Sequence, residues 1–181
     1  MEVIKTDLSE ILLIKPDAFE DNRGWFMETY SYKKYKELGI DVVFVQDNRS
    51  RTEYKGTVRG LHFQKSPHAQ SKLVTCTRGR LLDVVVDLRK KSPTYKKWIA
   101  VELSESNKYQ LFVPKGFAHG FVALEDKTEL LYKVDDFYSK ECDRSIKFND
   151  PEISVDWGVT DPILSDKDLN APYLAQSDVD F

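Results

Sequence analysis

Short apolar runs, separated by glycine and proline, fill the middle of the chain. In LLDVVVDL, residues 81–88, every even-numbered side chain is apolar, and the odd-numbered face mixes Asp83 and Asp87 with leucine and valine. Side chains alternate across a strand with period two, so this pattern predicts a strand with one fully apolar face. Four more runs are typical of short strands: WIAVEL (98–103), YQLFV (109–113), GFVAL (120–124) and ELLYKV (129–134). The series predicts an all-β sandwich, jelly roll or barrel.

The two ends of the chain are less regular than the middle. Ser31 can cap a single early helix in which Tyr32, Tyr35 and Leu38 share a face, and Gly39 would end it. From about Pro151 onward, Asp, Pro and Ser are scattered, which predicts a loop-rich segment with one short helix laid over the β core. No repeat or linker interrupts the sequence. We therefore expect residues 1–181 to form one domain.

Composition and charge exclude several classes of function. No stretch approaches the roughly 18 apolar residues of a membrane helix. The 27 basic and 30 acidic residues give a net charge of −3, which gives no electrostatic support for nucleic-acid binding. The start of the chain lacks the basic and apolar regions of a signal peptide, and Cys76 and Cys142 lack metal-ligand spacing. These features predict a cytoplasmic protein with reduced thiols, no membrane and no nucleic acid.

TVRGLHFQ, residues 57–64, presents a conflict. In a regular strand Arg59 and His62 would point to opposite faces, and one polar side chain would face the core. A bulge at Gly60 would bring both side chains to one face. The pattern alone leaves both arrangements open, and a site that uses both side chains would require the bulge.

Three histidines can be considered one by one. His68 lies in a polar, turn-like stretch and is expected to be exposed, whereas His62 and His119 stand beside glycine and aromatic residues. A lone buried histidine usually has a structural role, but two of them near Arg59 and Lys72 are hard to explain by packing alone. A catalytic metal site usually needs three protein ligands, and no H-x-H pair is present. We therefore expect no metal.

Two further residues are ambiguous when taken alone. Tyr132 in ELLYKV is typical of a core or dimer-interface tyrosine, and Asp168 in LSDKDLNAP is typical of a solvated loop carboxylate. Either residue becomes a candidate for chemistry only if the fold places it near a histidine.

A family resemblance supplies such a placement. PKGFAH (114–119) has the P-x-G-x-x-H form of the second cupin motif, while the metal-binding H-x-H of the first motif is missing. The chain resembles the dTDP-4-dehydrorhamnose 3,5-epimerase family of metal-free cupins. The resemblance rests on eight ordered blocks: DNRGWFMETY (21–30), FVQDNRS (44–50), TVRGLHFQ (57–64), QSKLV (70–74), GRLLDVVVDLRKKSPTY (79–95), FVPKGFAHGF (112–121), LLYKVDDFYS (130–139) and LSDKDLNAP (164–172).

The resemblance implies a cupin-type jelly roll, a double-stranded β-helix barrel, with a few short helices and a loop-rich C-terminal segment. It also implies the roles of individual residues. His62 matches the catalytic base, Tyr132 the general acid, Asp168 the carboxylate paired with the base, and Lys72 a catalytic residue beside the keto sugar. Residues that match substrate-contacting positions are Arg23, Glu28, Gln46, Asn48, Arg59, His119 and Lys167. Asp143 stands where the family commonly has glutamate, so we leave it outside the expected site.

The implied reaction is epimerisation at carbons 3 and 5 of dTDP-4-dehydro-6-deoxy-D-glucose, and its chemistry suits these residue types. Histidine titrates near neutrality, at about 6.5, and can remove an acidified C–H proton. An aspartate would orient it, Lys72 would stabilise the enolate, and Tyr132 would return a proton from the opposite face. Only protons move, so we expect no cofactor.

Three alternatives stay open from the sequence. A cupin 3-epimerase or 3,4-ketoisomerase of dTDP-keto sugars would use similar parts, since fold alone does not separate them. A non-catalytic nucleotide-sugar-binding jelly roll would bind without proton exchange, and a metal-dependent cupin would lose activity with a chelator.

The resemblance further implies a homodimer that exchanges strands. The segment EVIKTDLSEILLIKP, residues 2–16, is strand-like and amphipathic, and we expect it to make the exchange. Arg23 and Glu28 would then serve the partner's site.

Overall fold

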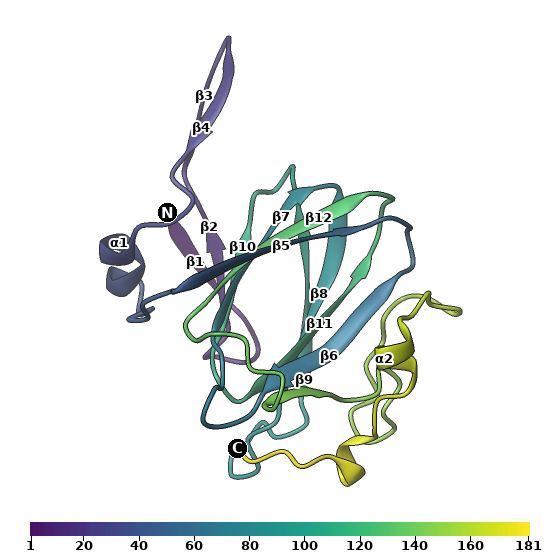
Figure 1. Cartoon of the computed structure of the whole chain (residues 1–181). Coiled ribbons are helices and arrows are strands. Elements are labelled where there is room, and N and C mark those ends of the chain that lie inside the picture. Colours follow the sequence, from purple (N-terminus) through teal and green to yellow (C-terminus); the bar gives the residue numbers. More distant parts are fainter.

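Two antiparallel sheets face each other in the computed structural model, which describes residues 1–181 (Figure 1). The first sheet has the strand order β1 (Glu2–Lys5), β2 (Leu12–Lys15), β10 (Gln110–Val113), β7 (Lys72–Arg78), β12 (Thr128–Val134) and β5 (Gln46–Thr52). The second has the order β13 (Asp143–Ser145), β6 (Val58–Gln64), β11 (Phe117–Ala123), β8 (Arg80–Asp87) and β9 (Trp98–Ser104). The prediction of a mainly β architecture is confirmed, and the four short runs correspond to β9, β10, β11 and β12.

β8 shows how the alternating pattern builds the core. Its odd-numbered residues Leu81 and Val85 belong to the cluster between the sheets, together with side chains of β7 and β10. Its even-numbered residues Val84 and Val86 belong to a second cluster on the other face of the same sheet. Both faces of β8 are therefore buried, and its aspartates point into the space between the sheets.

The C-terminal segment covers the outer face of the five-stranded sheet. Ile153, Trp157 and Val179 pack there against side chains of β6 and β8. Regular structure in this segment is limited to α2 (Asp166–Leu169) and the 3-10 turn η1 (Leu174–Gln176). α2 lies beside β6 (Figure 1). The prediction of a loop-rich segment with a short helix over the β core is confirmed.

The predicted early helix is α1 (Tyr32–Glu37), with Ser31 at its N-cap position. The Ser31 side chain makes no capping hydrogen bond, so burial of Tyr35 holds the helix instead. Tyr35 is fully buried against Ile14 and Leu73 on the outer face of the six-stranded sheet, and its hydroxyl bonds Gln110. No helix of the structure has the length and hydropathy required to cross a membrane.

The segment expected to exchange between subunits pairs within its own chain. β1 pairs with β2, and β2 pairs with β10 of the same chain, so residues 2–15 complete their own sheet. The projecting element is instead the hairpin of β3 (Ala18–Asp21) and β4 (Gly24–Met27), which stands clear of both sheets (Figure 1). Phe19 and Phe26 on this hairpin are 67% and 71% exposed. An amphipathic pattern predicts that a segment pairs, but it does not identify the sheet that the segment joins.

The conflict in TVRGLHFQ is resolved by a bulge. His62 of β6 pairs with His119 of β11, but Arg59 pairs with Phe121, so two residues of β6 oppose the single Gly120. Gly60 has φ +128°, and a Cβ there would lie 2.6 Å from the Cα of Gly120. The extra residue puts Arg59 and His62 on the same face, away from the outer cluster that contains Val58, Leu61 and Phe63. The predicted bulge is confirmed.

Substitution of Gly60 by alanine should lower the free energy of unfolding by more than about 2 kcal/mol, because the new Cβ meets backbone atoms that cannot move aside. Urea unfolding measures the change. Gly158→Ala is the matched control: Gly158 also has a positive φ, of +67°, but no atom lies within 4 Å of the added Cβ. It should cost only about 1 kcal/mol. Equal losses in the two variants would contradict the close approach of β6 and β11.

Candidate active site

A cavity of about 310 Å³ opens between the two sheets beside the C-terminal segment. Strands of both sheets and α2 contribute its walls. The lining residues are Gln46, Asn48, His62, Phe63, Gln64, Gln70, Lys72, Tyr132, Tyr138, Asp143 and Lys167. The cavity thus gathers three of the four predicted catalytic residues, and the fourth, Asp168, contacts His62 from behind.

His62 and Asp168 form a close pair although they stand 106 residues apart in sequence. Nε2 of His62 lies 2.5 Å from Oδ1 of Asp168, whose side chain is only 3% exposed. The hydroxyl of Ser165, at the N-cap of α2, donates to the other carboxylate oxygen at 3.0 Å. Because Asp168 occupies Nε2, the Nδ1 atom of His62 is the ring nitrogen left to accept a proton.

The Asp168 carboxylate is ionised at neutral pH. Burial alone would raise the pKa of this carboxyl, but the hydrogen bond and charge of His62, with a smaller contribution from Ser165, bring the pKa below its ordinary value. A buried, ionised carboxylate on one nitrogen fixes the tautomer of the imidazole and stabilises its protonated form.

Lys72 of β7 faces the same cavity without an ion-pair partner. The carboxylates whose charges raise its pKa, Asp83 and Asp143, are paired instead with His119 and Lys167. Burial lowers the pKa of Lys72 to about 8, although the two carboxylates oppose this effect. The site therefore holds a desolvated ammonium whose hydrogen bonds remain available to an anion.

Tyr132 reaches the cavity from β12 in the six-stranded sheet, while His62 reaches it from β6 in the five-stranded sheet. The phenol and the imidazole therefore approach the enclosed space from opposite walls. Burial raises the pKa of the Tyr132 phenol, against a smaller opposing effect of the Arg59 charge. Tyr132 stays protonated at neutral pH and can act as a proton donor.

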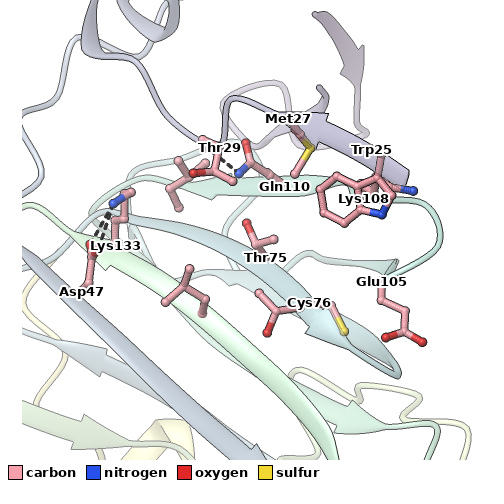
Figure 2. Close-up of a pocket in the computed structure, with 13 residues that line it drawn as sticks. Trp25, Met27, Thr29, Asp47, Thr75, Cys76, Glu105, Lys108, Gln110 and Lys133 are labelled. Atoms are coloured by element: carbon pink, nitrogen blue, oxygen red, sulfur yellow. Dashed lines mark hydrogen bonds and ion pairs between the residues drawn. The ribbon is translucent and has the colours of Figure 1, made fainter. Parts of the chain in front are cut away.

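A second, larger cavity of about 370 Å³ lies on the other face of the six-stranded sheet, under β4 (Figure 2). Trp25 and Met27 of the hairpin form one wall, and Thr75 lies on the opposite wall (Figure 2). This cavity contains no histidine or tyrosine, and Lys133 within it is bound to Asp47 at 3.0 Å. The residues suited to proton transfer lie in the smaller cavity.

Comparison with known proteins identifies the family of the chain. The family model described as dTDP-4-dehydrorhamnose 3,5-epimerase matches residues 5–176. The chain belongs to this family.

Individual family members resemble the chain over nearly their whole length. The dTDP-4-dehydrorhamnose 3,5-epimerase of Shigella flexneri is 49% identical over 179 residues, which cover 98% of each chain. The crystal structure of the Bacillus anthracis enzyme with TDP and PPi bound is 50% identical, with a TM-score of 0.94, and the match covers 96% of this chain and 99% of that one. The Legionella pneumophila enzyme in complex with dTDP-4-keto-L-rhamnose is 44% identical, with a TM-score of 0.93 and coverage of 98% and 94%. The predictions of the family and of its cupin-like jelly-roll fold are confirmed.

Four residues matched to the family's substrate contacts do not line the cavity of the single chain. Arg23 pairs with Asp21 at 2.6 Å and Glu28 pairs with Lys34 at 2.9 Å, both on or just after the projecting hairpin. The other two, Arg59 of β6 and His119 of β11, lie on neighbouring strands of the five-stranded sheet.

Arg59 and His119 are held by neighbouring side chains. Arg59 Nε donates to the hydroxyl of Thr52 at 3.0 Å. The Nε2 atom of His119 lies 2.9 Å from each carboxylate oxygen of Asp83, which is fully buried. The family resemblance did not single out Asp83, and sequence reasoning noted only that it shares a strand face with Asp87.

Other cavity residues were also missed. Gln64 stands two positions after His62, so the period of two in β6 could have placed it on the same face. Asp143 lines the cavity despite its shorter side chain, and its carboxylate accepts a hydrogen bond from Lys167 at 2.6 Å. Across the structure, no group of three or more His, Cys, Asp or Glu side chains is arranged to hold a metal ion.

Asp168→Asn should destabilise the fold in a pH-dependent way. The pKa of Asp168 is lowered in the folded state, so its contribution to stability is present above the unfolded value of 3.8 and is lost as the pH falls through the lower folded value. Urea unfolding at neutral pH should show a loss in the variant, and the difference from wild type should shrink below about pH 4. Asp166→Asn, on the exposed side of the same helix, should show no such pH dependence. A loss that is constant across this range would contradict the ion pair with His62.

Proposed function

We propose that this protein converts dTDP-4-dehydro-6-deoxy-D-glucose to dTDP-4-dehydro-L-rhamnose by epimerisation at carbons 3 and 5, in the biosynthesis of dTDP-L-rhamnose. The observation that carries the proposal is the cavity in which an imidazole and a phenol face each other from two sheets, with an unpaired ammonium beside them. The names and bound ligands of the related enzymes support the same substrate.

The first chemical step is removal of a proton from a carbon next to the ketone. His62 is the base: its Nδ1 takes the proton, and Asp168 on Nε2 stabilises the imidazolium that forms. The electron pair of the broken C–H bond forms a double bond to the carbonyl carbon. The product is an enolate, with negative charge on the former carbonyl oxygen. The ammonium of Lys72 donates to that oxygen. Such a preorganised donor is typically worth about 3 kcal/mol of barrier.

The second step returns a proton from the other face of the sugar. Tyr132 gives its phenolic proton to the carbanionic carbon, which inverts the centre and restores the ketone. Each inversion leaves His62 protonated and Tyr132 ionised. Before the next inversion, His62 gives its proton to solvent and Tyr132 takes one up. The two carbons flank the same carbonyl, so one base, one acid and one enolate-stabilising group serve both inversions.

The remaining predicted residues are assigned to binding. Gln46, Asn48 and Lys167 line the cavity and offer hydrogen bonds to the sugar and nucleotide. Arg59 lies close enough to lower the pKa of Tyr132, and its guanidinium suits a diphosphate. His119, the cross-strand neighbour of His62, is assigned to the binding of the sugar.

Arg23 and Glu28 reach a substrate only if the hairpin serves another subunit. We therefore propose a homodimer in which the β3–β4 hairpin, rather than residues 2–16, extends over the partner's cavity. The exposed aromatic side chains of the hairpin support this exchange, because burial at an interface would remove them from water. Within the dimer each 181-residue chain would act as one domain, and we propose that the enzyme works in the cytoplasm.

Proton exchange with solvent tests the reaction. The purified protein should be incubated with dTDP-4-dehydro-6-deoxy-D-glucose in heavy water, with a metal chelator and without any added cofactor, while proton NMR follows the sugar. Deuterium should enter at both carbon 3 and carbon 5, and the product should be dTDP-4-dehydro-L-rhamnose.

Each rival predicts a different spectrum. Entry of deuterium at carbon 3 alone would assign the protein as a 3-epimerase, and migration of the ketone to carbon 3 would assign a 3,4-ketoisomerase. Loss of activity with the chelator would indicate a metal-dependent cupin. Binding without any exchange would leave only a nucleotide-sugar-binding module and would refute the proposed enzyme.

A further inference from the structure

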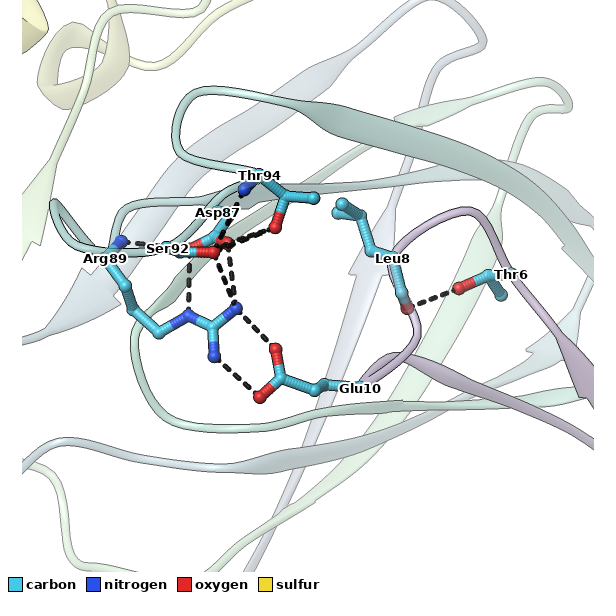
Figure 3. Close-up of polar contacts among 7 residues, drawn as sticks. All are labelled: Thr6, Leu8, Glu10, Asp87, Arg89, Ser92 and Thr94. Carbon is cyan, nitrogen blue, oxygen red and sulfur yellow. Dashed lines mark hydrogen bonds and ion pairs between the residues drawn. The ribbon is translucent and has the colours of Figure 1, made fainter.

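Two aspartates occupy the inner face of β8, and both are fully buried. The carboxylate of Asp87 has all its hydrogen-bonding capacity taken up by residues of the loop that follows β8, as Figure 3 shows. Its carboxylate accepts four side-chain hydrogen bonds, from Arg89 Nε at 2.9 Å, Arg89 Nη2 at 2.8 Å, Ser92 Oγ at 2.6 Å and Thr94 Oγ1 at 2.7 Å. Arg89 also binds Glu10. Burial would raise the pKa of Asp87, but these donors hold it at about 2. The charge of Asp87 is therefore neutralised locally, and it serves the fold.

Asp83, four residues earlier on the same face, has a different environment. Its only side-chain partner is the Nε2 atom of His119, at 2.9 Å from both carboxylate oxygens. One N–H cannot satisfy two buried anionic oxygens as fully as the four side-chain contacts of Asp87, and an undercompensated buried charge is costly. The negative charge of Asp83 is therefore available to act on other groups between the sheets.

Lys72 shares this interior from the facing sheet: Asp83 lies on the inner face of β8, and Lys72 of β7 lines the cavity between the two sheets. Asp83 is the strongest of the charges that raise the pKa of Lys72 against burial, ahead of Asp143 on β13, while Lys167 on α2 lowers it. The other titratable side chains that line the cavity are His62 on β6, Tyr132 on β12 and Tyr138, and His119 on β11 lies beside His62. His62 and His119 are direct cross-strand partners, so the Asp83–His119 pair lies immediately beside the catalytic base.

We propose that Asp83 is a positioning residue: its buried carboxylate holds His119 beside His62, and it lies in the same space between the sheets as Lys72, where the enolate oxygen forms. The inference rests on the proposed function for the role of Lys72. Asp83 touches neither the substrate nor the reacting atoms, and it acts through Lys72 and His119. The same strand thus carries one aspartate for the fold, Asp87, and one for the site.

The pH dependence of kcat separates this role from a structural one. In the wild type, kcat should fall as the pH rises through about 8, where Lys72 loses its proton. Tyr132 does not account for this decrease, because its pKa is raised above its ordinary value of 10. Removing the negative charge of Asp83 makes the ammonium form less favourable, so Asp83→Asn should move the decrease to lower pH by about one unit. KM should change little.

Asp87→Asn is the matched control, because it removes an equally buried carboxylate from the same face of β8. It should lower stability but leave the alkaline decrease of kcat at the wild-type pH. Asp83→Glu retains the charge and should restore the wild-type profile in part. Asp83→Ser, which leaves room for a water molecule, takes the place of the amide variant if that variant does not fold.

A direct titration of Lys72 makes the test independent of catalysis. NMR of protein with ¹⁵N-labelled lysine side chains, assigned with Lys72→Arg, should show the Lys72 signal titrating at lower pH in Asp83→Asn than in wild type and Asp87→Asn. If the protein has no epimerase activity but this shift is seen, the proposed function fails while the electrostatic link stands. If the Lys72 titration and the alkaline decrease are unchanged in Asp83→Asn, the positioning role is refuted and Asp83 serves packing alone.

Discussion

The active site depends on one extra residue in one strand. The bulge at Gly60 lets two residues of β6 oppose the single Gly120 of β11, which turns Arg59 and His62 to the same side. Only glycine fits, because any side chain at residue 60 would meet the backbone of the neighbouring strand. The bulge also directs the backbone N–H of Gly60 toward Asp168, whose pKa it helps to lower. A local irregularity of the sheet thus orients His62, the proposed base, and supports the carboxylate behind it.

The two facing sheets allow side chains to approach a substrate from opposite sides. Inversion of a carbon needs a base and an acid on opposite sides, and two facing sheets present side chains to a shared interior from opposite directions. β6 carries His62, while β12 and β7 of the other sheet carry Tyr132 and Lys72. Burial between the sheets then adjusts their acidities: it lowers the pKa of Lys72 and raises that of Tyr132. The hydrophobic core and the residues proposed for catalysis therefore share the space between the two sheets.

Much of this arrangement could be predicted from local sequence rules, and the failures have physical causes. The period of two located the strands of the middle region, and the conflict between Arg59 and His62 located the bulge. The contact between His62 and Asp168 spans 106 residues, so no spacing rule could find it, and it was expected only from the family resemblance. Residues 2–15 were expected to pair with another subunit but pair within their own chain, because amphipathicity does not distinguish pairing within a subunit from pairing between subunits. The contact between Asp83 and His119 depends on strand register, which the pattern of one strand does not contain.

The central claim is that His62 and Tyr132 act on opposite faces of the sugar. It is tested most directly by following deuterium entry and configuration together in His62→Asn and Tyr132→Phe, with substrate in heavy water. The account predicts no deuterium entry in His62→Asn. In Tyr132→Phe it predicts entry with retained configuration, because the base returns a deuteron to the face from which it took the proton. Inversion at the wild-type rate in Tyr132→Phe, or deuterium entry in His62→Asn, would contradict the claim.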